Sequence, residues 1–155
     1  MSGEVTPPQG GAAAPPVSEK GVQYGPVPGA DSARYGFNPR QMARIDEAIT
    51  LSSRETGLTF SVYVGRLEGD SREAAEALFT RLADTGVPAP VLVAVSPEQR
   101  VLQIVTGEYS SRRLPNRSCA LAALGMRAAF TGGDLTGGIV TGLRMLADAA
   151  GAPHR

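Results

Sequence analysis

The sequence predicts an α/β fold, a three-layer α/β/α sandwich with a small mixed sheet, in the order α-β-α-β-β-α-α. Three observations predict it. Two segments rich in β-branched apolar residues, Leu58–Val64 and Val91–Gly107, have the composition of strands. The polar break Ser96–Gln99 divides the second segment, which is typical of a β-hairpin. Helical patterns flank the strands, and apolar runs on both central strands indicate a sheet covered on both faces.

The first helix and the first strand begin the globular part. Asn38 is a favoured N-cap residue, Pro39 suits the first helical position, and Gly57 ends the helix. The apolar residues of this helix recur at helical spacing: Met42, Ile45 and Ile49. The strand that follows places alternate residues on one face of the sheet: Leu58, Phe60, Val62 and Val64.

The second helix connects the first strand to the hairpin. Asp70 or Ser71 caps it, and its inner face has i, i+3, i+4, i+7 spacing: Ala75, Leu78, Phe79 and Leu82. The β-α-β unit predicts that the first two strands are parallel, with a right-handed crossover. The third strand should be antiparallel to the second, because only a short turn joins them.

Two helices end the chain. The third begins around Leu114–Asn116, runs to about Phe130, and is apolar on nearly all sides, which predicts deep burial. Asp134 caps the fourth helix and Gly151 ends it, with an inner stripe of Leu135, Ile139, Leu143 and Leu146. The intervening segment Thr131–Gly138, TGGDLTGG, lacks the Gly-Lys-Ser/Thr ending of a phosphate loop. Its glycines are expected to permit a tight turn and close helix contacts.

The domain boundaries follow from composition. Residues 1–34 are rich in Pro, Gly and Ala and are expected to form a disordered tail, with a short extended piece at Val22–Val27. Residues 35–151 are expected to form the single α/β domain, and residues 152–155 a frayed C-terminus.

Composition excludes several functions. The formal net charge of +0 gives no support to binding of nucleic acid through bulk charge. With one cysteine and one histidine, a His/Cys zinc site and a histidine-based triad are unsupported, and Cys119 is expected to be an inert core thiol. No leader peptide or bilayer-spanning segment is visible, so we expect a cytoplasmic protein without an integral membrane segment.

The candidate site lies where the hairpin strands have their open ends. The start of the second strand and the end of the third meet at one edge of the sheet, near the start of the third helix. The ligand-binding candidates there are Asp84, Thr106, Glu108, Tyr109, Arg112, Asn116 and Arg117. The helix N-terminus could hold an anion. Alternatively, Asp84 and Glu108 could hold Ca²⁺ or Mg²⁺, or Glu108 could form a surface pair with Arg112 or Arg113.

Beyond these residues, the chain resembles the TPM domain family from about Asn38 to Ala150. The resemblance rests on Val91–Gly107, Phe130–Leu135 and Gly137–Ile139. That family includes a thylakoid-lumen photosystem-repair protein, a nematode acetylcholine-receptor modulator and many bacterial proteins. It implies the same fold, and some members are reported as acid phosphatases or calcium binders that use acidic residues at this edge of the sheet.

A closer similarity is to an actinobacterial family of unknown function. It rests on Ile45–Ala48, Ser53–Leu58 and Gly142–Asp148. This resemblance implies the fold and no particular reaction.

Two functions remain open. The first is a small, non-enzymatic, TPM-like module that binds a protein partner or a small ligand and needs no cofactor. The alternative is a weak, metal-dependent acid phosphatase that uses Asp84 and Glu108 for the cation and Arg112 or Arg117 for phosphate. The sequence names neither the partner nor the oligomeric state.

Overall fold

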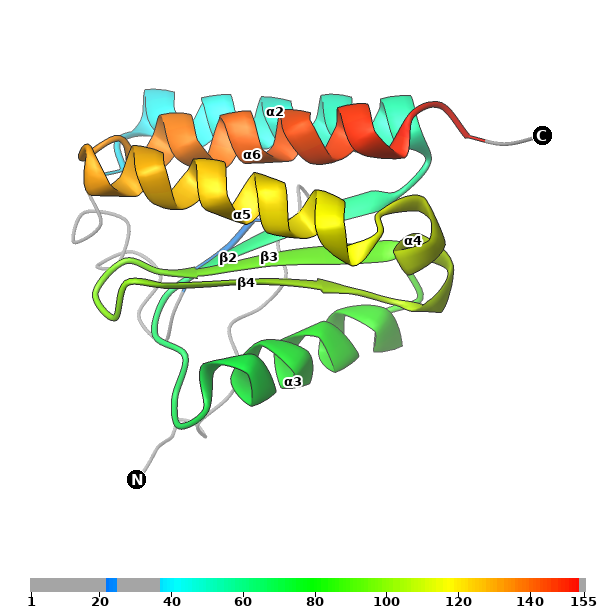
Figure 1. The fold of residues 1–155 in the computed structure, drawn as a ribbon, viewed down its shortest axis with the longest axis horizontal. Coiled ribbons are helices and arrows are strands. Elements are labelled where there is room, and N and C mark those ends of the chain that lie inside the picture. Colours follow the sequence, from blue (N-terminus) through cyan, green and yellow to red (C-terminus); the bar gives the residue numbers. More distant parts are fainter. Residues whose placement is uncertain (1–21, 25–36, 154–155) are drawn as a thin grey trace.

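A computed structural model describes residues 22–24 and 37–153 of the chain. It has a central sheet with helices on both faces, so the predicted three-layer sandwich is confirmed (Figure 1). The predicted tail falls almost entirely outside the described residues. The elements are β1 (Val22–Tyr24), α2 (Pro39–Thr56), β2 (Thr59–Val64), α3 (Ser71–Asp84), β3 (Pro90–Ser96), β4 (Val101–Thr106), α4 (Glu108–Arg113), α5 (Asn116–Thr131) and α6 (Leu135–Ala150).

The sheet has four strands in the order β1-β2-β3-β4. β2 pairs in parallel with β3, with Phe60 opposite Val91, and β4 pairs antiparallel to β3, with Val91 opposite Thr106. Both predicted pairings are therefore confirmed. The predicted extended piece near residue 22 is confirmed in part, because the three residues of β1 pair in parallel with β2.

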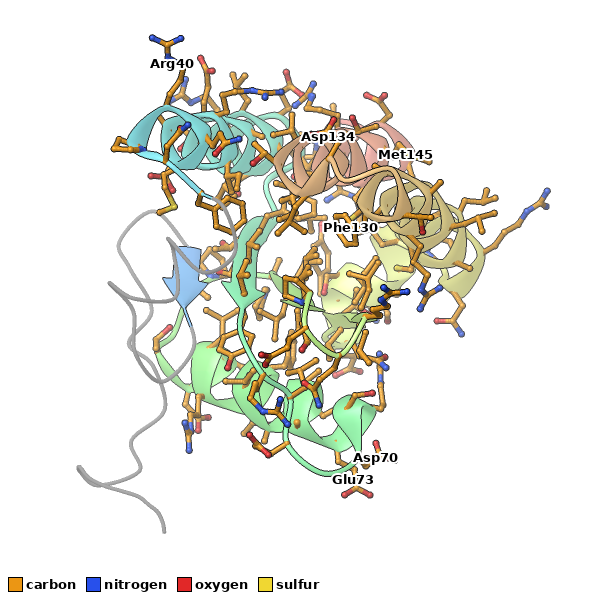
Figure 2. The ribbon with its side chains drawn as sticks, turned by 90° about the vertical axis from the view of Figure 1, so that its left-hand side faces the viewer. Arg40, Asp70, Glu73, Phe130, Asp134 and Met145 are labelled. Carbon is orange, nitrogen blue, oxygen red and sulfur yellow. The ribbon has the colours of Figure 1, made fainter. Side chains whose placement is uncertain are left out.

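The predicted helix ends match the observed caps. At the start of α2, the Asn38 side chain accepts from the Gln41 N–H and the Gln41 side chain accepts from the Asn38 N–H. α2 ends at Gly57, as predicted. Asp70 and Asp134 cap α3 and α6 by accepting backbone N–H groups of the first turn, and Figure 2 looks at the end of the molecule that holds both caps.

Two apolar clusters hold the layers together. On one face of the sheet, β2 and β3 residues such as Phe60 and Val93 pack with α2, α5 and α6. On the other face, Leu92 and Val105 pack with Leu82 of α3. The predicted inward face of the first strand, including Leu58, lies in the first cluster. No helix among the described residues is both long and apolar enough to cross a membrane.

The predicted deep burial of the third helix is wrong. In α5 only Ala122 and Met126 are buried, whereas Leu121 and Leu124 are 52% and 64% exposed. The reason is the order of the helices: α6 packs against both α2 and α5, so it lies at the centre of the helical layer and α5 at its margin (Figure 1). An apolar composition does not by itself tell the centre of a layer from its edge.

The glycines of the α5–α6 segment serve a turn and close contacts, as predicted. Gly133 adopts a φ of +88°, a left-handed conformation that favours glycine in the turn. A Cβ atom at Gly138 would lie 2.7 Å from the Phe130 ring, and one at Gly142 would lie 2.5 Å from Met126 Cγ. The backbone of α6 therefore approaches α5 at distances that only glycine allows.

Candidate functional site

The predicted site residues lie at one end of the molecule. The C-terminal end of α3, all of α4 and the start of α5 lie together there (Figure 1). This end is called the α4 end below. Six of the seven candidates are exposed and Thr106 is half-buried. Among the described residues, no three His, Cys, Asp or Glu side chains cluster as metal ligands.

The segment after β4 forms a helix that the sequence reasoning missed. The Ser110 hydroxyl accepts from the Gly107 N–H (2.9 Å) and donates to the Pro90 carbonyl (2.9 Å). The first contact starts α4, and the second ties α4 to the start of β3. This short helix brings Tyr109 beside two arginines, with the ring centroid 5.7 Å from Arg112 Cζ and 5.9 Å from Arg113 Cζ.

Arg113 is the most constrained polar residue at the α4 end. Arg113 is only 7% exposed. The guanidinium donates to Tyr109 Oη at 3.1 Å and to four backbone carbonyls, with the shortest contacts at Thr56 O (3.0 Å), Ala150 O (3.3 Å), Gly151 O (2.9 Å) and Ala152 O (3.2 Å). The C-terminal ends of α2 and α6 thus converge on one cation. Their free carbonyls and negative dipole ends are stabilised by it.

The expected surface pair of Glu108 with Arg113 is therefore wrong. Arg113 is turned inward onto helix C-termini. Among the described residues, neither Glu108 nor Arg112 takes part in an ion pair. Sequence reasoning missed Arg113 because its acceptors lie 57 and 37 residues away along the chain. The pattern of adjacent arginines, Arg112-Arg113, gives no signal for which of them faces inward.

Cys119 lies in the first turns of α5, and the prediction of a core thiol holds only in part. The side chain is half-buried, and Sγ lies 3.8 Å from the Leu114 carbonyl oxygen. Burial raises the pKa of the Cys119 thiol above its ordinary value, and the Arg72 guanidinium opposes part of that rise. The thiol is therefore protonated at neutral pH, which does not favour a nucleophilic role.

A pocket lies at the opposite end of the sheet. It has a volume of about 410 Å³ and lies between the β3–β4 turn and the α5–α6 turn. Arg100 and Arg127 contribute charge to its wall, and Leu102 and Phe130 contribute apolar surface. Figure 2 looks at this end, with Phe130 below the α5–α6 turn, on the side of the sheet. This end is called the turn end below.

The edge of the sheet is covered by two arginines. Arg72 of α3 donates to the Ile104 carbonyl (2.9 Å), and Arg127 of α5 donates to the Leu102 carbonyl (3.4 Å). Both carbonyls belong to the edge strand β4 and point away from β3. The two side chains satisfy acceptors that would otherwise be available to a further strand.

The fold is that of a small α/β sandwich domain with a mixed sheet. The chain belongs to the family described as Domain of unknown function (DUF5130), whose model matches residues 19–147. It is 31% identical over 122 residues to uncharacterized proteins of two Mycobacterium tuberculosis strains, Rv2468c in H37Rv and MT2543 in CDC 1551. Each alignment covers 77% of this chain and 70% of the relative.

Solved structures share the fold at low sequence identity. The BA42 protein of Bizionia argentinensis has a TM-score of 0.66 at 18% identity, over 73% of this chain and 80% of BA42. The N-terminal domain of a P. gingivalis protein has a TM-score of 0.63 at 16% identity, over 74% of this chain and 77% of that domain. The N-terminal domain of cg2496 from Corynebacterium glutamicum has a TM-score of 0.57 at 14% identity, over 77% of this chain and 81% of that domain. These similarities extend to the fold alone.

Proposed function

We propose that this chain is a non-enzymatic interaction module that docks a protein partner on the exposed apolar face of α5. The observation that carries the proposal is the exposure of Leu121 and Leu124, 52% and 64%, on a helix whose composition predicts burial. Met145 of α6 is 37% exposed, and its Sδ lies 3.4 Å from where a Cβ of Gly125 would be. These three side chains form an apolar strip, called the α5 strip below.

The charge beside the α5 strip defines the partner. α5 contains Arg117 and Arg127 and has no acidic residue among Asn116–Thr131. Neither arginine forms an ion pair with a described residue. A partner helix with an apolar face and acidic flanks would bury the leucines and neutralise these charges, in the manner of a helix laid in a groove. A second copy of this chain would instead bring its own α5 arginines to the same surface.

A designed peptide pair tests the proposal. The probe is an amphipathic helical peptide with leucines on one face and glutamates on both flanks. The matched control peptide carries lysines in place of the glutamates. In an NMR titration of the full chain, the glutamate peptide is expected to shift amides of α5 and α6 and to bind at least about tenfold more tightly than the lysine peptide. Equal binding of the two peptides would contradict the proposal.

Three variants locate the contact. Leu121→Gln and Leu124→Gln are expected to weaken peptide binding about tenfold or more, because they remove apolar surface from the α5 strip while keeping a good helix former. Leu51→Gln on α2 is the control, since Leu51 is 39% exposed on a different helix. Sedimentation velocity adds the remaining outcome: a dimer that Leu124→Gln disrupts would assign the strip to a second copy and overturn the acidic partner.

The metal-dependent acid phosphatase is the alternative, with Asp84 and Glu108 as the cation ligands and Arg112 or Arg117 for phosphate. Its support is the TPM resemblance and the location of these residues at one end of the sheet. Two carboxylates alone form a sparse ligand set for Ca²⁺, which takes six to eight oxygens. A Ca²⁺ titration separates the two functions: amide shifts confined to residues 84 and 108 would favour the hydrolase.

We keep the wider TPM assignment and a cytoplasmic location as parts of the proposal. The TPM assignment is supported by the hairpin and the Phe130–Leu135 motif. The location is supported by the single unpaired cysteine, which suits a reducing compartment. Fractionation of cells that produce the full chain tests the location, and recovery in the membrane or culture medium would contradict it.

A further inference from the structure

We infer that the pocket at the turn end binds a small organic anion: a carboxylate or phosphate group carried on an apolar body. Its volume of about 410 Å³ is within the range of small-molecule sites, about 300–1,000 Å³. The pocket shares Arg127 with the flank of the α5 strip, but it contains none of the strip's three apolar side chains, so the inference does not depend on the proposed partner.

The charge of the pocket selects an anion. Arg100 and Arg127 line it, and no Asp or Glu does. Neither arginine forms an ion pair with a described residue. The Arg127 contact to the Leu102 carbonyl is long, 3.4 Å, and involves only Nη2, so other donors of the guanidinium remain for a ligand. Two guanidinium groups with unused N–H donors can donate to the oxygens of a carboxylate or phosphate.

The acidic residues nearest to the pocket in the sequence are engaged elsewhere. Glu98 of the β3–β4 turn forms an ion pair with Arg66 at 3.1 Å. Asp134 accepts the Gly137 N–H at 2.9 Å as the N-cap of α6. Both carboxylates are thus fixed by contacts to groups outside the pocket lining. The positive charge of the pocket is not cancelled by its own loops.

The apolar part of the pocket requires an apolar body on the ligand. Phe130 and Leu135 are half-buried apolar residues of the lining. An inorganic anion would contact the arginines and leave the apolar part of the lining exposed to water. An aromatic or aliphatic group attached to the anion would cover it, and this burial would add to the affinity.

The backbone at Arg100 gives independent support. Arg100 adopts a φ of +58°, and its N–H bonds the Pro97 carbonyl to close the turn. The left-handed region favours Gly or Asn and is unfavourable for an arginine, because its Cβ crowds the following carbonyl oxygen. An arginine at a position whose backbone favours glycine departs from the usual residue preference, and such departures concentrate at functional sites.

Matched probes test the inference on the full chain. The probes are 2-naphthoate, 2-naphthyl phosphate and the neutral 2-naphthamide, titrated into labelled protein and followed by amide NMR shifts. Both anions are expected to shift residues of the two turns and to bind at least about tenfold more tightly than the amide. The stronger of the two anions identifies the head group as carboxylate or phosphate. Equal binding of 2-naphthamide, or shifts confined to another surface, would overturn the inference.

Variants assign the binding to the two arginines. Arg127→Gln removes one guanidinium and keeps helix propensity, whereas Arg100→Asn removes the other and suits the left-handed backbone. Each is expected to reduce anion affinity about tenfold and to leave 2-naphthamide binding unchanged. Arg81→Gln on the exposed face of α3 is the control for net charge. Unchanged anion affinity in both pocket variants, with amide spectra that remain folded, would refute the inference; Leu124→Gln should bind the anions normally.

Discussion

The α4 end and the turn end both carry arginines, and the fold uses them in opposite ways. At the α4 end, Arg113 is buried and donates to carbonyls at the C-terminal ends of α2 and α6. At the turn end, the last carbonyls of α5 accept N–H groups of the turn itself: Gly133 donates to Phe130 O and Asp134 to Ala129 O, both at 2.9 Å. The arginines of that end therefore have donors left over.

This contrast teaches how to read an arginine near a helix end. A guanidinium is buried and fully hydrogen-bonded when helix C-termini converge and the nearby backbone has too few N–H donors for their carbonyls. It stays available to a ligand when the turn satisfies those carbonyls first. Whether helix C-terminal carbonyls still lack a donor thus decides whether a nearby arginine stabilises the fold or is available to bind a ligand.

The largest expected effect is at Arg113. Arg113→Met keeps much of the apolar stem and removes every donor, so the carbonyls of Thr56 and Ala150 lose a charged partner. We expect the free energy of unfolding to fall by about 2–4 kcal/mol, measured by urea denaturation. Arg112→Met is the matched control on the same helix, with an expected change within about 0.5 kcal/mol, because Arg112 is exposed. An equal fall in the free energy of unfolding of both variants would show that Arg113 contributes no more to stability than Arg112.

The next prediction compares two glycines of α6. Gly142→Ala places a Cβ 2.5 Å from Cγ of the buried Met126. Overpacking costs about 1–3 kcal/mol, which outweighs the gain of about 1 kcal/mol from alanine in a helix. A Cβ at Gly138 would lie 2.7 Å from the Phe130 ring and 3.0 Å from Ala129 Cβ, but Phe130 lines the pocket, into which its ring can turn. We therefore expect a net loss of up to about 2 kcal/mol for Gly142→Ala and a smaller loss for Gly138→Ala.

Thermal or urea unfolding of the two alanine variants measures the difference. The Gly138→Ala variant carries a second readout, because a displaced Phe130 should narrow the pocket and weaken binding of 2-naphthoate. Gly125→Ala is the control, since its Cβ would meet Met145 at an ordinary 3.4 Å. A larger loss for Gly138→Ala than for Gly142→Ala would mean that the turn end is as closely packed as the interior.

The sequence predicts what local signals determine. The Asn38 cap, the Gly57 stop and the hairpin break at Ser96–Gln99 are encoded within a few residues, and each matches the structure. The apolar runs along β2 and β3 likewise predict a sheet buried on both faces. These features depend on neighbours that are adjacent in the sequence.

What the sequence does not predict depends on distant neighbours. The burial of α5 depends on whether α5 or α6 lies at the centre of the layer, and their similar apolar content does not decide it. Arg113 finds Thr56 across 57 residues. The pocket forms between two turns that are separate in the chain, so the sequence reasoning gave priority to the open strand ends. A signal was present at Arg100, an arginine where a tight hairpin turn favours glycine.

The smallest expected effect concerns the thiol of Cys119, which reports on how closed the α4 end is. Because burial raises the pKa of this thiol, alkylation by iodoacetamide at pH 8 should be slower than that of N-acetylcysteine, with an inflection at higher pH. Arg72→Gln should move the inflection higher still, because the Arg72 charge lowers this pKa. By linkage, the stability contributed by the neutral thiol is present below the unfolded pKa and is lost as the pH rises through the raised folded value. A rate and inflection equal to those of the free thiol in the folded protein would mean that the α4 end is open to solvent at Cys119.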